Sequence, residues 1–178
     1  MTGDGVHRIG RVCGSALADL YRGSAWSPVV TPAGGVHLTE PIAATTNLAL
    51  ADLTRRLRPG GTLVGFPEGG FFNYVLGQRT PLREEQFFPG RLDAAAERRV
   101  ARRLEEEPPD AILLANVHAV GEGARAFGKD YLLELAAVLE RRFRVVAAFG
   151  PGAGPTAAIG DPQFFIEVRV PAPAPGRP

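Results

Sequence analysis

Residues 60–76 read GGTLVGFPEGGFFNYVL, and this stretch decides the fold class. Residues 62–66 form a short, mostly apolar run of strand length, and Pro67 ends it because proline has no N–H for the ladder. The two glycines that follow Glu68 permit positive φ, so we expect a sharp turn there. One or two helical turns over residues 71–76 come next. The stretch therefore predicts a strand, a loop at its carboxyl end and a short helix.

Three longer helices are predicted around this stretch from apolar residues that recur every three or four positions. Thr45 and Thr46 are candidate N-caps of the first helix, Asp93 of the second and Asp130 of the third. The helices are expected to end near Pro59, Pro108 and Phe143. The segment from Arg79 to Gly90 has no clear period and predicts a long surface connection, a kind of segment that is often functional.

Three further strands complete the predicted sheet. Residues 111–117 and 144–149 are almost continuously apolar, which is typical of parallel strands buried on both faces. Residues 163–170 alternate instead, with Glu167 and Arg169 on one side, and predict a half-exposed edge strand. The fold class expected is α/β, with a small, mainly parallel sheet flanked by helices and an edge strand at the C-terminus.

The chain has 178 residues, the length of one ordinary domain. Residues 1–43 are rich in glycine and proline and are interpreted as an irregular lead-in, with a short helix across 15–21 and a brief strand near 36–38. Residues 44–170 are expected to form a single α/β domain. Residues 171–178 form a proline-rich tail.

Composition excludes several classes of function. The 20 basic and 19 acidic residues give a net charge of +1, so no nucleic-acid partner is indicated. One cysteine and three histidines leave no intrachain disulfide and almost no material for a zinc site, and we expect neither a metal nor a cofactor. Without an apolar run long enough to span a bilayer or a signal segment, we expect a soluble chain.

Two motifs are rejected because a residue that their chemistry needs is missing. Residues 123–129 fit the phosphate-binding pattern GxxxxGK, but Asp130 stands where a hydroxyl is required, and a carboxylate would repel phosphate. Residues 66–69 read FPEG, as in glycerolipid acyltransferases. The histidine with an aspartate five residues later, which those enzymes use as base and orienting group, is absent from the chain.

The carboxyl ends of the predicted strands place residues 67–74, 118–122 and 150–161 along one rim, where ligands bind in such sheets. The polar groups expected there are Glu68, Asn73, Tyr74, Arg79, Arg83 and His118. A carboxylate, an amide and a guanidinium in one crevice suit sugar hydroxyls or a phosphate-bearing head group.

A purely structural interpretation of these residues is favoured. In it Glu68 pairs with Arg79 to fasten the long connection, Asn73 caps the short helix and His118 merely ends a strand. No pair of these residues has the spacing that catalysis demands, so no catalytic residue is assigned.

The stretch FPEGGFFNYVLGQRTP, residues 66–81, resembles a block in the soluble C-terminal domain of bacterial polytopic membrane glycosyltransferases of the GT-C superfamily, those related to protein mannosyltransferases. The resemblance continues through the blocks FFP, PPDAILL, FGKDY and FRVVAAFG, and it spans residues 60–170. In that family the catalytic acid lies in a loop between membrane helices. The resemblance therefore implies an extracytoplasmic domain without the catalytic part, and a cytoplasmic location is the alternative.

The leading hypothesis is a non-catalytic domain that handles an acceptor, such as a sugar or lipid-linked sugar, or docks to a polytopic membrane protein. One rival is a small soluble enzyme acting on a sugar or phosphate compound, with Glu68 and His118 as acid and base. The other is a protein interaction module in which exposed Phe71 and Phe72 contact a partner.

Overall fold

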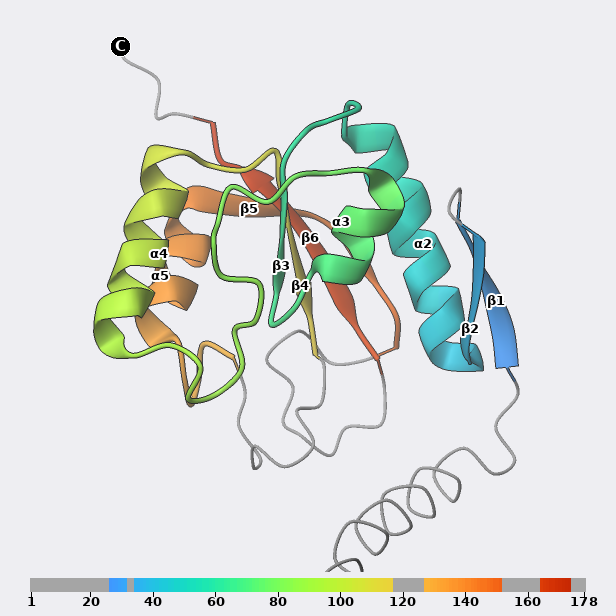
Figure 1. Ribbon diagram of the computed structural model, residues 1–178, viewed down its shortest axis with the longest axis horizontal. Coiled ribbons are helices and arrows are strands. Elements are labelled where there is room, and N and C mark those ends of the chain that lie inside the picture. The colour runs from blue at the N-terminus through green and yellow to red at the C-terminus, as the bar shows by residue number, and fades with distance from the viewer. Residues whose placement is uncertain (1–25, 32–33, 117–126, 152–163, 174–178) are drawn as a thin grey trace, which may run out of the picture.

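The structure, a computed structural model, describes residues 26–31, 34–116, 127–151 and 164–173. Within these ranges the chain forms two sheets and four helices (Figure 1). The elements are β1 (Trp26–Thr31), β2 (Gly34–Thr39), α2 (Glu40–Arg56), β3 (Leu63–Phe66), α3 (Gly70–Leu76), α4 (Ala94–Glu106), β4 (Ala111–Ala115), α5 (Leu133–Arg142), β5 (Phe143–Phe149) and β6 (Ile166–Pro171). The α/β class is confirmed.

The main sheet is mixed, with the strand order β3-β4-β6-β5. Strands β3 and β4 pair in parallel, whereas β6 pairs antiparallel with both β4 and β5. Strands β3, β4 and β5 therefore run in one direction, and their carboxyl ends lie at the same end of the sheet. The expected mainly parallel sheet with a C-terminal edge strand is wrong, because β6 is inserted between β4 and β5 and leaves β5 at the edge.

The alternating sequence of β6 is explained by a buried ion pair. Ile166 and Val168 are fully buried on one face, and on the other Glu167 and Arg169 are only 9% and 6% exposed. Arg169 Nε donates to Glu167 Oε1 at 2.5 Å, and its Nη2 donates to Glu140 of α5 at 2.5 Å. Burial alone lowers the pKa of Arg169, but these hydrogen bonds and the two negative charges outweigh it and raise the pKa above its usual value.

Helices cover both faces of the sheet (Figure 1). On one face α4 and α5 pack against a core that includes Val64, Phe66 and Ile112. On the other, α2 and α3 cover Leu63 and Leu113, the alternate side chains of the same strands. No described helix combines the length and hydropathy that crossing a bilayer requires.

Two strands lie within residues 1–43, which were expected to form an irregular lead-in. Residues 26–31 and 34–39 form the antiparallel strand pair β1–β2, which lies against α2, and Val29 is fully buried. The brief strand expected near residues 36–38 is confirmed as part of β2, whereas β1 was not predicted because Pro28 interrupts its apolar run. The helix expected across residues 15–21 lies outside the described residues.

Two of the three predicted helix caps are wrong. Asp93 does cap α4, since its Oδ1 accepts from the Ala96 N–H at 2.7 Å. Helix α2 instead begins at Glu40, with a proline in its first turn, and Thr45 and Thr46 are buried inside it.

The first turn of α5 is capped from another helix. Asp130 does not cap α5, which begins at Leu133. The backbone N–H groups of Glu134 and Leu135 donate instead to Oε1 of Glu97 in α4, at 2.8 and 3.0 Å. One carboxylate oxygen therefore satisfies two of the N–H groups that a helix start leaves without an intrahelical acceptor.

Candidate functional site

The outer edge of β3 is covered by an irregular segment, residues 78–87. At the start of β3, the Leu63 N–H donates to the Arg79 carbonyl and the Arg79 N–H donates to the Gly61 carbonyl, both at 2.9 Å. Beyond its end, Phe87 N–H donates to the Pro67 carbonyl at 2.8 Å. The covering segment is thus fastened at both ends of β3 and bows away from the strand between them.

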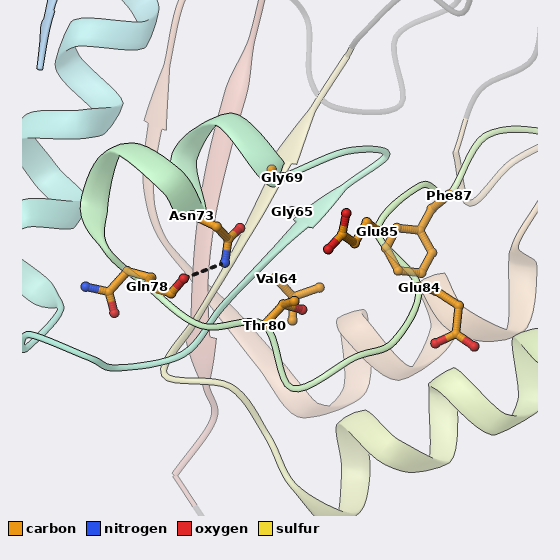
Figure 2. A pocket seen from close by; sticks show the side chains of 10 residues that line it. Val64, Gly65, Gly69, Asn73, Gln78, Thr80, Glu84, Glu85 and Phe87 are labelled. Atoms are coloured by element: carbon orange, nitrogen blue, oxygen red, sulfur yellow. Dashed lines mark hydrogen bonds between the residues drawn. The ribbon is translucent and has the colours of Figure 1, made fainter. Parts of the chain in front are cut away.

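The space under this bow is a pocket of about 280 Å³ (Figure 2). It is lined by Val64, Gly65, Gly69, Gly70, Asn73, Gln78, Thr80, Glu84, Glu85 and Phe87. Alternate residues of a strand turn their N–H and C=O groups to opposite sides. Because those of Leu63 point to the covering segment, those of Gly65 also point outward, toward the pocket.

Two glycines allow α3 to begin directly against the strand. A Cβ on Gly65 would lie 2.3 Å from Gly69 Cα, and a Cβ on Gly69 would lie 2.6 Å from Gly65 N. Any larger side chain at either position would separate the backbones. This close approach sets the depth of the pocket, because it places the first turn of α3 beside the outward face of Gly65.

Polar side chains from both walls face the pocket. On the α3 wall, Asn73 Nδ2 donates to the Leu63 carbonyl at 2.9 Å and to the Gln78 carbonyl at 3.5 Å, and these bonds fix the carboxamide in place. On the opposite wall, the carboxylate of Glu85 points toward Asn73, whereas that of Glu84 points away, toward α4 (Figure 2). Thr80 also lines the pocket, and its hydroxyl oxygen accepts from the Leu82 N–H at 3.3 Å. The site thus offers a carboxylate, a carboxamide, a hydroxyl and backbone groups.

The structure brings only one of the candidate residues, Asn73, into this pocket. Glu68 is exposed, and only its backbone takes part, in a bridge to Gln86. Tyr74 is 76% exposed on the outside of α3, and Arg79 donates from Nε to the Gly60 carbonyl at 3.2 Å. His118 lies outside the described residues.

The structural interpretation of these residues also needs correction. Glu68 and Arg79 form no ion pair within the described chain, so the covering segment is fastened by its backbone instead. Asn73 does not cap α3 but lies within it and ties the helix to β3.

Phe71 and Phe72 are not the exposed pair that a docking surface needs. Phe72 is 8% exposed, and Phe71 is half-buried against the same core. The two rings contact each other edge to face, with centroids 5.3 Å apart. Their place in the core removes the observation on which the interaction-module hypothesis depended.

The pocket residues missed from the sequence, chiefly Gly65, Thr80 and Glu85, lie on β3 and the covering segment. The only signal for them was the length of the connection from Arg79 to Gly90. Nothing local indicated that this connection returns along the edge of β3. Within the described residues, no three side chains of the His, Cys, Asp and Glu types gather as a metal site.

Comparison with family models, curated proteins and solved structures finds no match to this chain.

Proposed function

We propose that this chain is a non-catalytic domain that binds the hydroxyl groups of a small carbohydrate in the pocket beside β3. One observation carries the proposal: the Glu85 carboxylate faces the fixed Asn73 carboxamide across a pocket into which the backbone of Gly65 also points. A carboxylate binds vicinal hydroxyls well, because hydrogen bonds to an ionised acceptor are about twice as strong as neutral ones. The Asn73 Oδ1 adds a neutral acceptor, since its Nδ2 already donates to the Leu63 and Gln78 carbonyls.

The size of the pocket limits the ligand. Its volume of about 280 Å³ lies at the lower end of small-molecule sites, which span roughly 300–1,000 Å³. The ligand is therefore one small polar molecule or one terminal ring of a longer chain. A terminal sugar fits this description, and so does the acceptor end of a lipid-linked saccharide.

The arrangement of carboxylates favours binding over turnover. Glycoside chemistry generally uses two carboxyl groups that face one substrate from opposite sides. Of the carboxylates in the described part of the chain, only Glu85 points into the pocket, since Glu84 turns toward α4 and Glu68 is not among the lining residues. The domain would then hold an acceptor for a partner that performs the transfer, as the resemblance to the soluble domain of GT-C membrane glycosyltransferases implies.

The test is a titration of the isotope-labelled protein with glucose, mannose and galactose, followed by amide NMR. At least one sugar is expected to shift the amides of Gly65, Gly69 and Asn73. The variant Glu85→Gln, which keeps the shape of the side chain, should weaken that binding about tenfold. Glu106→Gln, an exposed carboxylate on α4 outside the pocket, is the matched control and should leave it unchanged.

Two results would overturn the proposal. One is the absence of any shift at the pocket amides with every sugar at 50 mM, about the weakest affinity that such a site could usefully have. The other is sugar binding that Glu85→Gln and Glu106→Gln leave equally intact, because the carboxylate would then have no part in it. Conversion of a sugar substrate by the purified protein would contradict its non-catalytic character.

A further inference from the structure

A second hollow, separate from the carbohydrate pocket, lies between the covering segment and α4. Its volume is about 330 Å³. Leu82 and Val100, which are 7% and 2% exposed, form an apolar floor. Arginines occupy both walls: Arg83 comes from the covering segment, and Arg99 and Arg103 come from α4. We call this hollow the arginine groove.

The geometry of α4 concentrates the positive charge. Arg99 and Arg103 are four residues apart, so they lie on the same side of the helix, one turn from each other. Arg83 reaches the same groove from a different part of the chain. Three arginine residues therefore line one small space in a protein whose net charge is only +1.

These charges are only partly neutralised by the protein. Arg103 pairs with Glu107 at 2.7 Å, and both side chains are about half exposed. Among the described residues, no carboxylate lies within 4.0 Å of the guanidinium of Arg83 or Arg99. Glu84 lines the groove but pairs with none of the three arginines. Like charges that line one space repel each other, and an anion that enters relieves this repulsion.

We infer that the arginine groove binds a phosphate group. The planar guanidinium presents its N–H donors in a fork that matches two phosphate oxygens, which makes arginine the preferred residue for such recognition. Arginines on two facing walls can bond different oxygens of one tetrahedral anion. The apolar floor suits the uncharged atoms to which the phosphate is attached.

Glu84 connects this inference to the rest of the surface. It lines both the groove and the carbohydrate pocket, so the two hollows share one wall. A phosphate on a sugar could lie in the groove while the ring lies in the pocket. The groove would also accept free phosphate or the head group of a phospholipid. The phosphate is common to all three, and the inference concerns that group alone.

The experiment measures the binding of sodium phosphate at constant ionic strength, by calorimetry and amide NMR. The double variant Arg83→Gln/Arg99→Gln should weaken phosphate binding at least about tenfold. The control is Arg98→Gln/Arg102→Gln, which removes the same charge from exposed arginines of α4 that do not line the groove. Less than a twofold change is expected there. Glu84→Gln should strengthen binding at least about twofold, because it removes a negative charge beside the anion.

Equal losses of phosphate affinity in the two double variants would overturn the inference, because binding would then reflect only the general positive charge of the surface. So would phosphate-induced shifts that avoid the amides of residues 82–84, Arg99 and Val100, or the absence of binding at about 20 mM phosphate. Circular dichroism of each variant confirms that it is folded.

Two further probes identify the source of the phosphate. Tighter binding of glucose 1-phosphate than of phosphate, lost in both the groove variant and Glu85→Gln, assigns a sugar phosphate. Binding to vesicles that contain phosphatidic acid, lost only in the groove variant, assigns a lipid head group. If Glu85→Gln weakens sugar binding and leaves phosphate binding intact, the two sites are independent. Failure of one proposal then does not contradict the other.

Discussion

The two edges of the main sheet differ in how they meet their surroundings. Strand β3 is buried along its whole length, because helices cover both of its faces and residues 78–87 cover its outer side. Strand β5 forms the other edge, where no second strand pairs with it within the described ranges, and Val145 in its middle is 48% exposed. Both strands are mostly apolar in sequence. The comparison teaches that the burial of an edge strand depends on which distant segment returns to cover it, and not on its own composition.

The same difference explains where the pocket lies. A regular strand added to β3 would have used every outward N–H and C=O group and left no space. The irregular segment is bonded only near Leu63 and Pro67. The outward groups of Gly65 between them remain directed at the pocket, so incomplete covering of β3 creates the site.

Arg169→Ala should cause the largest loss of stability and would weaken the attachment of β5. Arg169 of β6 stands opposite Val145 in the antiparallel register. Without the guanidinium, the buried Glu167 carboxylate loses its counter-charge, and we expect a loss of about 3–5 kcal/mol in urea unfolding. Glu140→Ala removes the exposed partner, whose side chain is 71% exposed, and should cost under about 1 kcal/mol. Similar losses in the two variants would contradict this account of the buried pair.

Gly65→Ala should be the most disruptive single change at the covered edge. The added methyl group meets the backbone of Gly69, which cannot yield without moving α3, and a loss of about 3 kcal/mol is expected from thermal or urea unfolding. Gly70→Ala is the control, because nothing lies within 4 Å of its Cβ and alanine favours a helix. A stable Gly65→Ala protein would mean that the two backbones do not touch.

Asn73→Ala should cost about 1–2 kcal/mol, since the Leu63 carbonyl then lacks the donor that ties α3 to the covered edge. The loss would be accompanied by faster exchange of the Leu63 and Arg79 amides. Tyr74→Ala, its exposed neighbour, is expected to change stability by less than about 0.5 kcal/mol. If the two variants are equally stable, Asn73 does not fasten the edge.

The smallest effect is predicted at the open edge. Val145→Thr should alter the free energy of unfolding by less than about 0.5 kcal/mol, because the hydroxyl remains in water. Val64→Thr, the same change at a position 2% exposed in β3, should cost about 1–3 kcal/mol. Chemical unfolding of both variants measures the difference between the two edges. Equal changes in the free energy of unfolding would contradict it.

Local signals in the sequence predicted what local contacts determine. Helix α4 has its cap, its apolar period and its terminating prolines within one short stretch, and its predicted start is correct. The start of α5 was wrong because its capping oxygen belongs to Glu97, 37 residues from Glu134. No pattern near Asp130 could reveal that.

Long-range pairing limited the rest of the prediction. Glu167 and Arg169 indicated an exposed edge because charged residues are rarely buried, and only their pairing with each other and with Glu140 makes the central position of β6 possible. In the site, Asn73 was identified because it lies in residues 67–74, the stretch after the carboxyl end of β3. Glu85 was not, because its place depends on the path of the covering segment along β3.

The carboxylate of Glu97 has a consequence for the motions of the helical layer on that face. Since the opening turn of α5 has its N–H groups bonded to a side chain of α4, neither helix can shift along its axis without stretching those bonds. The pair should behave as a single body in which α5 frays only when α4 moves away. The wall of the arginine groove therefore belongs to a unit larger than one helix.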